Sequence, residues 1–172
     1  MDDKLFKRDG VYTVALYTID AAGNRNGTLL HGNEEELRFG IDRTSPVIQL
    51  LNINSHGTYN DSSRLTAIMV RDNLKLSDVS IYLNDEVVEY TLDGDIYSFY
   101  IKEDETTQQL RIIAYDEAGN ECAKEVDDIM ISTTPKTRWN HRMRNALMIL
   151  AGVSGVISLA LLIRHRLFCR SR

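Results

Sequence analysis

The chain has 172 residues, of which 43% are hydrophobic, and a formal net charge of −5. Its charges are unevenly distributed: residues 1–133 hold 12 Lys/Arg against all 25 Asp/Glu, whereas residues 134–172 hold eight Lys/Arg and no acid. An acidic main part argues against a nucleic-acid-binding surface, so we expect no nucleic-acid partner. The length suits one complete domain of about 90 residues, part of a second domain and a C-terminal segment of different character.

Residues 1–46 are predicted to be the C-terminal part of a β domain. The stretch 11–20 is rich in β-branched and aromatic residues that alternate with period two, which is typical of a strand. A returning strand is expected over 35–41, and Pro46, which has no amide hydrogen for a ladder, marks a domain boundary. Two or three strands are too few to close a sandwich, so we interpret this part as a truncated domain.

Residues 47–134 are predicted to form a complete β-sandwich. Short β-branched and aromatic runs recur there and are separated by turn-forming groups such as Asn84-Asp85 and Asp93-Gly94-Asp95. Seven strands are expected, over 47–51, 65–71, 79–83, 86–91, 96–100, 110–115 and 121–131. This number of strands in one domain favours two packed sheets and an all-β fold.

An internal repeat is the most specific feature of residues 1–134. The sequence YTIDAAGN at 17–24 returns as IAYDEAGN at 113–120, 96 residues later, an offset of about one domain. Upstream of the shared motif, Val14 aligns with Leu110 and Leu16 with Ile112, on the predicted inward face. The repeat therefore indicates two copies of one module.

The repeated Asp-x-Ala-Gly-Asn motif is predicted to be a structural turn. Glycine adopts positive φ freely and asparagine does so more readily than most residues, while an aspartate carboxylate can accept amides two or three residues further on. A cation site is the alternative, since Asp20 with Asp42, or Asp72 with Asp116, could converge where loops meet, although the spacing of an EF-hand is absent. We favour the turn and expect no metal or cofactor; the predicted turn residues are Asp20, Gly23, Asn24, Asp116, Gly119 and Asn120.

These elements resemble a known family. The turn motif followed by FGIDRTSP at 39–46, and RDNL at 71–74 followed by VSIYLN at 79–84, resemble a bacterial immunoglobulin-like domain, a module strung in tandem in large surface proteins of Gram-positive bacteria. The resemblance covers residues 9–134. It implies an immunoglobulin-like β-sandwich that belongs to a stalk or adhesin outside the cell. Some modules of this family are attached to secreted enzymes, but the family brings no catalytic residues.

Motifs that would indicate catalysis are missing from the sequence. It contains no nucleophile elbow, phosphate-binding Gly-rich loop or dinucleotide fingerprint. Neighbouring carboxylates at 93–95 and 103–105 are best explained as solvated turns. Metal-ligand spacing is absent among the two cysteines and the four histidines, His31, His56, His141 and His165. We therefore expect that the chain is not an enzyme.

Aromatic side chains could provide a contact surface. Tyr90, Tyr97, Phe99 and Tyr100 gather around a predicted hairpin, and the adjacent Phe99 and Tyr100 must point to opposite faces of a strand. Ordinary packing within the sheet is the favoured interpretation. Exposed members of the group could instead bind an extracellular protein or carbohydrate.

The C-terminal segment is predicted to be a membrane anchor. Residues 145–163 are nineteen residues without a charge, enough for a helix of about 28 Å against a bilayer core of about 30 Å. We expect a basic linker at 135–144, a single transmembrane helix from Asn145 to Ile163 and a basic cytoplasmic tail at 164–172 that begins with Arg164 and Arg166. Trp139 would lie at the lipid interface. A buried helix in a globular core is the alternative.

Orientation does not follow from charge, since four Lys/Arg precede the uncharged stretch and four follow it. The family resemblance places the N-terminal part outside the cell. Residues 134–138 also resemble a sortase sorting signal, Leu-Pro-x-Thr-Gly: Pro135 and Thr137 match, whereas Thr134 replaces Leu and Arg138 replaces the Gly at the cleaved bond. A retained anchor is therefore favoured over attachment to the cell wall.

The combined prediction is a membrane-anchored, non-catalytic stalk or adhesin segment of a bacterial cell-surface protein, which spaces a distal region from the membrane and contacts membrane lipid. One alternative is an accessory stalk of a surface-attached hydrolase, which the coding sequence upstream of Met1 would reveal. The other is a degenerate sortase-sorted cell-wall protein.

Overall fold

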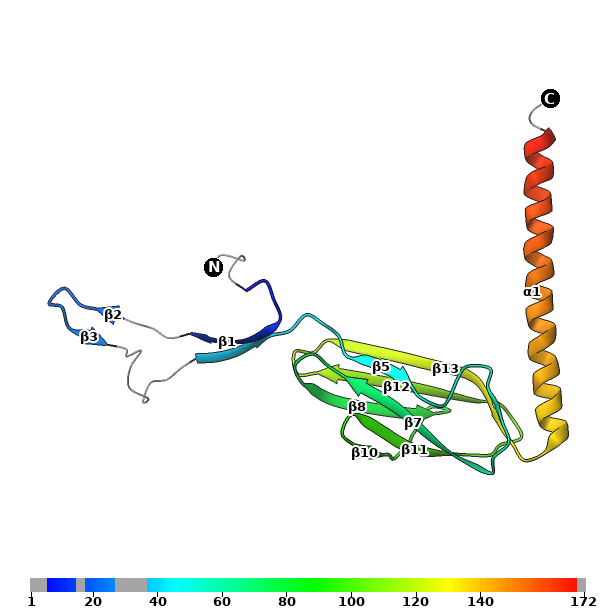
Figure 1. Cartoon of the computed structure of the whole chain (residues 1–172), viewed down its shortest axis with the longest axis horizontal. Coiled ribbons are helices and arrows are strands. Elements are labelled where there is room, and N and C mark those ends of the chain that lie inside the picture. Colours follow the sequence, from blue (N-terminus) through cyan, green and yellow to red (C-terminus); the bar gives the residue numbers. More distant parts are fainter. Residues whose placement is uncertain (1–5, 15–17, 27–36, 170–172) are drawn as a thin grey trace.

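A computed structural model of the chain describes residues 6–14, 18–26 and 37–169, with side chains except at residues 25, 26, 37 and 153–169. Three parts follow one another along the chain: an N-terminal β segment, a β-sandwich and a long C-terminal helix. The N-terminal segment and the helix lie at opposite ends of the sandwich (Figure 1). The sandwich therefore has two junctions, one with the N-terminal segment and one with the helix, at opposite ends.

Two short ladders form the N-terminal segment. Strand β1 (Gly10–Val14) pairs antiparallel with β4 (Leu37–Ile41), and β2 (Thr18–Ile19) pairs with β3 (Arg25–Asn26). The rings of Phe6, Tyr12 and Phe39 pack together with centroids 5.0 to 5.8 Å apart. The pairing of β1 with β4 confirms the predicted returning strand. The single strand expected over 11–20 is two strands, with residues 15–17 outside the described part.

The sandwich consists of two sheets. The first has the strand order β10-β11-β7-β5, with β5 at Val47–Leu50, β7 at Ser63–Arg71, β10 at Thr91–Asp93 and β11 at Ile96–Lys102. The second has the order β6-β13-β12-β8-β9, with β6 at Thr58–Tyr59, β8 at Leu76–Leu83, β9 at Glu86–Val87, β12 at Gln108–Asp116 and β13 at Glu121–Ile131. All ladders in the two sheets are antiparallel except that of β6 with β13.

This strand order is that of an immunoglobulin-like sandwich. If β5, β7, β8, β10, β11, β12 and β13 are lettered A to G in chain order, the first sheet contains A, B, E and D and the second contains C, F and G. Strand β9 adds a C′ strand beside β8. The predicted immunoglobulin-like sandwich is therefore confirmed by its connectivity.

The core lies between the sheets and is built by alternation. In β12 every second residue faces inward, and Leu110, Ile112 and Ala114 are completely buried. Ile68 and Val70 of β7 face them from the other sheet, also without exposure. Each such aliphatic side chain contributes about 1.5 to 3 kcal/mol on burial. The inward positions predicted from the repeat are thus confirmed in the second copy.

Most predicted strands differ from the structure by one to three residues at an end, and two differences are larger. The strand expected over 86–91 is split into β9 and β10, because the chain leaves the second sheet after Val87 and joins the first at Thr91. Strand β6 was not predicted, since two residues cannot show a period. Its parallel pairing with β13 at Thr58 and Tyr59 is a tertiary contact that local sequence does not encode.

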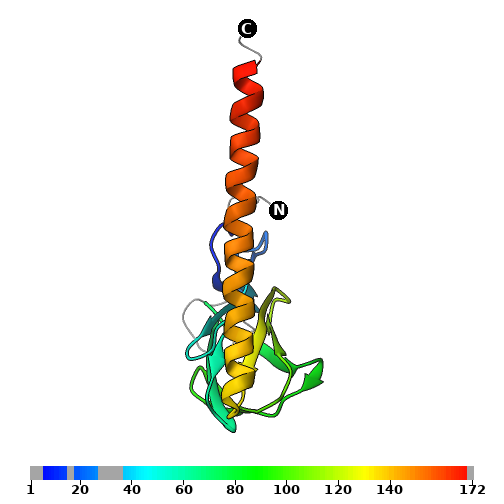
Figure 2. The same ribbon diagram turned by 90° about the vertical axis from the view of Figure 1, so that its right-hand side faces the viewer.

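Helix α1 extends from Pro135 to Cys169, 35 residues or about 52 Å, and rises away from the sandwich (Figures 1 and 2). The Thr134 carbonyl accepts the Arg138 amide at 3.3 Å, and Pro135 occupies the first helical position, where its missing amide hydrogen has no cost. The stretch 135–144, predicted to be a basic linker, is helical and forms the first part of α1. No Gly or Pro follows Pro135 in this stretch to interrupt the helix.

Among the residues that the structure describes, no helical segment combines the length and the hydropathy that a membrane crossing needs. The predicted span at 145–163 therefore stays a prediction. The side chains of Ile163, Arg164 and Arg166, predicted to end the span and begin the tail, lie outside the described residues.

Candidate functional site

Both copies of the repeated motif form the predicted turn, with the same hydrogen bonds. In the first copy the Asp20 carboxylate accepts the Asn24 amide at 2.8 Å and the Asn24 side-chain amide at 2.7 Å. In the second, the Asp116 carboxylate accepts the corresponding Asn120 groups at 2.8 and 2.7 Å. Gly23 and Gly119 both have a φ of 87°, a conformation that glycine adopts without strain. The structural interpretation of the motif is therefore correct in both places.

The second turn also belongs to a cluster of carboxylates, the junction cluster, which consists of Asp42, Asp72 and Asp116. One carboxylate oxygen from each lies within 4.8 Å of the others. Asp42 follows β4 of the N-terminal segment, Asp72 follows β7 and Asp116 ends β12, so three distant parts of the chain meet here. Of the two pairs considered from the sequence, Asp72 with Asp116 does converge. Asp20 is not part of this cluster.

The surroundings of the junction cluster are polar. Asp116 is 2% exposed; burial alone would raise the pKa of its carboxyl, but the hydrogen bonds from Asn120 hold that pKa below the ordinary value. The Asn120 side-chain amide also donates to the Asp42 carbonyl at 3.3 Å and so joins the two parts of the chain. Asp72 accepts the amides of Leu74 and Lys75 at 2.8 and 2.9 Å through one oxygen.

Asp9 adds a second link across the same junction. Its carboxylate accepts the Thr44 hydroxyl at 2.6 Å and the Asn73 side-chain amide at 3.4 Å, so it connects the stretch between β4 and β5, residues 42–46, with the sandwich. Its salt bridge to Arg43 spans 3.9 Å. The hydrogen bond from Thr44 is the main reason that the pKa of Asp9 is lowered.

A second polar cluster, the docking cluster, joins the sandwich to α1 at the opposite end. Asp128 of β13 accepts His56 Nδ1 at 3.0 Å and His141 Nε2 at 3.1 Å through one oxygen, and Arg144 through the other. His141, the seventh residue of α1, is 3% exposed, and its Nδ1 lies 2.7 Å from the Thr58 hydroxyl. The helix is thus bonded to β6 and β13 within its first three turns.

A bulge in β13 aims Asp128 at the helix. The β12 ladder passes from Val126 to Ile129 opposite Leu110 and Gln108, so β13 carries one extra residue there, and Asp128 has a φ of 57°. Aspartate tolerates this conformation better than most residues. Burial would raise the pKa of Asp128, but the bonds from His56 and Arg144 and the nearby His141 lower it to about 2.

The docking cluster changes the interpretation of Asn145. This residue was predicted to open the membrane span, but its side-chain amide lies 3.4 Å from the His56 carbonyl and 3.3 Å from His141 Nε2. Asn145 therefore contacts the sandwich. The sequence did not predict this contact, because an uncharged run does not show where the helix docks on the sandwich. Trp139, predicted to lie at a lipid interface, is 65% exposed on α1.

The aromatic group divides between core and surface as alternation requires. Tyr97 and Phe99 are buried, Tyr90 packs edge-on against Tyr97 with centroids 5.0 Å apart, and Tyr100 is 63% exposed. The favoured interpretation of packing within the sheet is confirmed for Tyr97 and Phe99. A sugar or protein contact through Tyr100 stays a prediction.

The other predicted surface carboxylates have structural partners. Glu103 accepts the Thr133 amide and hydroxyl at 2.9 and 2.7 Å, and Asp95 forms an ion pair with Arg71 at 2.7 Å. These bonds close turns and tie strand ends together.

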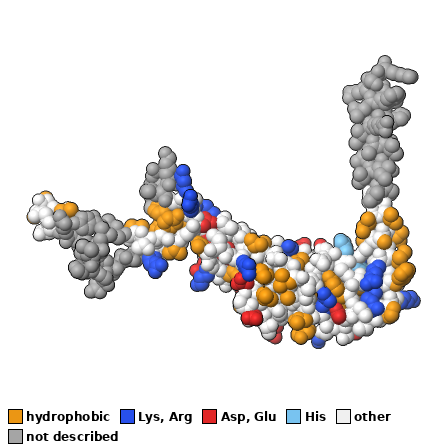
Figure 3. All heavy atoms as spheres, viewed as in Figure 1, with side chains coloured by type: hydrophobic (Ala, Val, Ile, Leu, Met, Phe, Trp, Pro, Cys, Tyr) orange, Lys and Arg blue, Asp and Glu red, His pale blue; other side chains and the backbone are white. Residues whose placement is uncertain are grey.

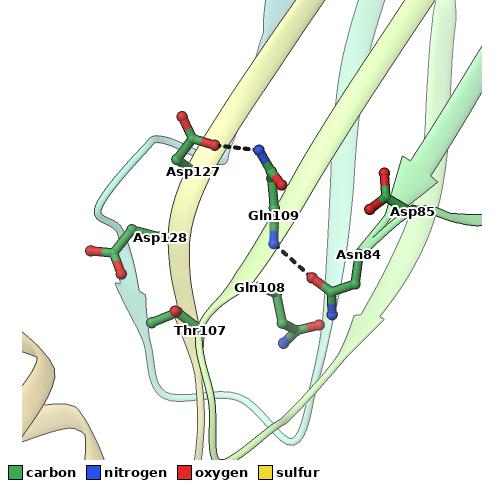
Figure 4. A pocket seen from close by; sticks show the side chains of 7 residues that line it. All are labelled: Asn84, Asp85, Thr107, Gln108, Gln109, Asp127 and Asp128. Carbon is green, nitrogen blue, oxygen red and sulfur yellow. Dashed lines mark hydrogen bonds between the residues drawn. The ribbon is translucent and has the colours of Figure 1, made fainter.

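A hollow of about 460 Å³ lies beside the bulge (Figure 4). Gln109 occupies its middle: its side-chain amide donates to Asp127 at 2.8 Å, and its backbone amide donates to Asn84 Oδ1 at 2.8 Å. Asp128 turns away from these groups, as the same view shows. The polar groups at the centre of the hollow hold β8, β12 and β13 together.

Comparison with known proteins adds little beyond the fold. No protein-family profile matches the chain, and no curated protein matches it. Among solved structures, one described as "Structures of Clostridium thermocellum CbhA fibronectin(III)-like modules" is similar, with 17% sequence identity and a TM-score of 0.42. The alignment covers 72% of this chain and 63% of that chain. The assignment of the sandwich therefore depends on its strand order and not on this likeness.

Sequence reasoning missed the docking cluster. His56, Asp128 and His141 are 72 and 13 residues apart along the chain, a spacing that matches no metal or catalytic motif. The available signal was weak: a histidine within a helix that starts directly after the last strand. The residues of the junction cluster were considered only in pairs, Asp20 with Asp42 and Asp72 with Asp116. The sequence did not show that Asp42, which follows β4, lies beside Asp72 and Asp116.

Proposed function

We propose that this chain is a membrane-anchored, non-catalytic stalk segment of a bacterial cell-surface protein. In this proposal the part of the uncharged stretch 145–163 that follows Asn145 crosses the membrane, because Asn145 itself contacts the sandwich. The sandwich and the N-terminal segment stand outside the cell. The sandwich would hold a more distal region away from the lipid. Its antiparallel ladders and closed core suit a load-bearing spacer.

The exposure of the helix beyond the docking cluster carries the proposal. Leu147, Met148, Ile149 and Leu150 are consecutive residues and are between 51% and 68% exposed. Four consecutive residues cover a full turn of a helix, so the apolar surface surrounds α1 instead of forming one stripe. Figure 3 shows this apolar group at the base of the helix, clear of the sandwich. An apolar surface of this kind needs an apolar environment, and lipid would supply it.

The docking cluster supports a mechanical role. Because Asp128 bonds to His56 of the sandwich and to His141 and Arg144 of α1, a force applied to the sandwich would pass to the helix through these polar contacts, of which the one to His141 is buried. A flexible linker would not transmit orientation in this way. We therefore infer that the sandwich is held at a fixed angle to the anchor.

The position of the sorting-like residues argues against the cell-wall alternative. Thr137 and Arg138 lie in the first turn of α1, and Arg138 Nη1 donates to the Ser132 carbonyl at 2.7 Å. A protease that cleaves an extended chain would have to unwind this turn first. A retained anchor therefore remains the better proposal.

The test is expression of the exported chain in Gram-positive cells, followed by fractionation and protease shaving. We expect the protein in the membrane fraction, and digestion of residues 47–133 in intact cells. Val153→Asp combined with Ile157→Asp should release it, since each central Asp costs about 2.5 to 3.5 kcal/mol on insertion.

The matched control places the same two charges on the sandwich, with Val87→Asp and Leu92→Asp at positions 74% and 56% exposed. This variant should stay in the membrane fraction. Wild-type chain that remains in the aqueous fraction without detergent would overturn the anchor. Protection of residues 47–133 until the cells are lysed would reverse the orientation.

A further inference from the structure

We propose that the outer face of the first sheet binds the same face of a second copy of this chain. Inward and outward positions alternate along β7 and β11, so the residues between the buried ones point away from the core. Apolar side chains predominate at the centre of this outward face. We call them the outer patch, which consists of Leu51, Leu65, Ala67, Met69, Ile96 and Tyr100.

The outer patch is continuous across three strands. Leu65 lies directly opposite Tyr100 in the ladder of β7 with β11, and Met69 lies opposite Ile96. Leu51 follows β5, which pairs with β7 on its other side. Leu51, Leu65 and Tyr100 are 42%, 50% and 63% exposed. A contiguous exposed apolar surface of this kind marks an interaction site.

The residue pattern of β7 differs from that of an ordinary antiparallel strand. Such a strand has apolar residues toward the core and polar residues on the solvated face. In β7 the inward Ile68 and Val70 are completely buried. The outward Leu65, Ala67 and Met69 are apolar as well. Apolar residues on both faces are typical of a strand that is covered on both sides.

The outer face of the second sheet provides a comparison within the same domain. Its central strand β12 has a single aliphatic residue, Ile113, among its outward positions, which include Gln109 and Tyr115. Gln109 donates to Asp127 at 2.8 Å, and the Tyr115 hydroxyl donates to Glu121 at 3.0 Å. One outer face of the sandwich thus carries polar groups that bond to one another, whereas the other exposes apolar side chains.

The sizes of the side chains fit a second copy. A two-fold axis across the strands reverses the strand direction, so the end of the patch with Tyr100 would lie over the end with Ile96 of the second copy. Ala67 and Ser98 lie opposite each other between these two ends and would lie near the axis. Their small side chains allow the sheets to approach to about 10 Å, the ordinary distance between packed sheets.

Charge supports the same orientation. Asp93 lies opposite Ile96 at one end of the patch, and Lys102 ends β11 at the other. Both residues are exposed, and neither forms a salt bridge within the described part of the chain. The two-fold axis would bring Lys102 of each copy toward Asp93 of the other, so the two faces have complementary charge.

The size of the face predicts a weak dimer. The first sheet has four strands, which limits the area that two such faces can bury to the low end of specific interfaces. Crosslinking detects a complex of this kind. The inference goes beyond the proposed stalk and does not require that α1 crosses a membrane, because the outer patch belongs to the sandwich.

The test uses the full chain in detergent micelles, with Cys122 and Cys169 replaced by serine, and a short bis-maleimide as the crosslinker. Ala67→Cys places a thiol near the proposed axis and should give a covalent dimer in denaturing electrophoresis. Ala123→Cys is the matched control, because Ala123 is exposed on the outer face of the second sheet, opposite Ile113. It should stay monomeric. Far-UV circular dichroism checks that each variant folds.

Further changes in the Ala67→Cys chain test the contacts. Leu65→Glu places a charge inside the interface and should lower the crosslinked fraction about tenfold or more. Val87→Glu is its control, because this apolar position is 74% exposed on the second sheet, and it should have no effect. Lys102→Asp should lower the crosslinked fraction about two- to fivefold, since like charges would meet. Adding Asp93→Lys to that variant should restore it.

The inference is overturned if folded Ala67→Cys gives no more dimer than Ala123→Cys, or if folded Leu65→Glu crosslinks as well as its parent chain. A reversal of both charges that does not restore the crosslink also overturns it, as does a chain that stays monomeric and binds another protein through this face. If α1 does not enter membranes, the same crosslinks should form without detergent, so failure of the anchor and failure of the dimer are distinguishable.

Discussion

In the turn at 20–24 the Asp20 carboxylate accepts the Asn24 amide at 2.8 Å, and in the turn at 116–120 Asp116 accepts the Asn120 amide at the same distance. Asp20 is exposed, whereas Asp116 is 2% exposed and lies beside Asp42 and Asp72. The motif therefore forms the same turn in both copies, but only the second copy has further carboxylates beside its aspartate. The comparison teaches that local hydrogen bonding decides the shape of the turn, and packing decides which groups surround its carboxylate.

The strands upstream of the two turns should show the largest difference. Leu110 is completely buried and its counterpart Val14 is 40% exposed. Leu110→Ala should lower the free energy of unfolding by about 2 to 5 kcal/mol, since it leaves a cavity between the sheets. Val14→Ala should cost less than about 1 kcal/mol. Urea unfolding of the full chain, followed by circular dichroism, measures both. Similar losses would mean that the first copy also packs into a core.

Asp128 extends the comparison to an aspartate with basic partners. Its folded pKa of about 2 lies below the ordinary value of 3.8, so the stabilisation is present above pH 4 and is lost as the pH falls toward 2. The difference in pKa corresponds to about 2 kcal/mol. Wild type should therefore lose more stability than Asp128→Asn between pH 5 and pH 2, as urea unfolding at each pH measures. Parallel pH profiles for the two proteins would contradict this assignment.

The asparagines of the two turns should differ by one contact. Asn120 donates to both Asp116 and the Asp42 carbonyl, whereas Asn24 donates to Asp20. Asn120→Ala should destabilise the chain by about 1 to 2 kcal/mol, and Asn24→Ala by about half of that, at about 1 kcal/mol for each hydrogen bond. Thermal unfolding of the two variants side by side gives the difference. An equal effect would show that the bond to Asp42 adds nothing.

The glycines should show the smallest difference. Gly23 and Gly119 have the same φ of 87°, and a Cβ at either position would meet open space. Alanine should therefore cost about 1 to 2 kcal/mol of backbone strain in each turn and nothing through clashes. Hydrogen exchange of the amides in each turn reports the two costs separately. A much larger cost at Gly119 would indicate that the junction cluster strains its turn.

Much of the fold followed from local pattern. Alternation in β12 placed Leu110 and Ile112 inward, and the spacing of turn residues separated most strands of the sandwich. The sequence did not indicate that the predicted linker at 135–144 is helical, and it missed β6, which exists only through its pairing with β13. Both differences concern segments whose structure depends on a neighbour: the docking of α1 and the position of β13.

The candidate sites followed less directly. Asp72 and Asp116 were considered as a pair. That Asp42 lies beside them depends on the path of residues 42–46 between β4 and β5 at the end of the sandwich. The docking cluster depends on a bulge that turns Asp128 toward α1, and a single inserted residue in a strand leaves no periodic trace in the sequence.

By itself, the sequence determined the repeated turn, the inward positions of β12 and the uncharged stretch at 145–163, because each depends on residues within a few positions of one another. Only the tertiary structure decided that the carboxylate of one of the two equal turns lies within 4.8 Å of those of Asp42 and Asp72. It also decided that Asp128 bonds to the base of the helix. The physical reason is that the interactions of a buried charge depend on every group within a few ångströms of it. Those groups come from strands and loops that lie far apart along the chain.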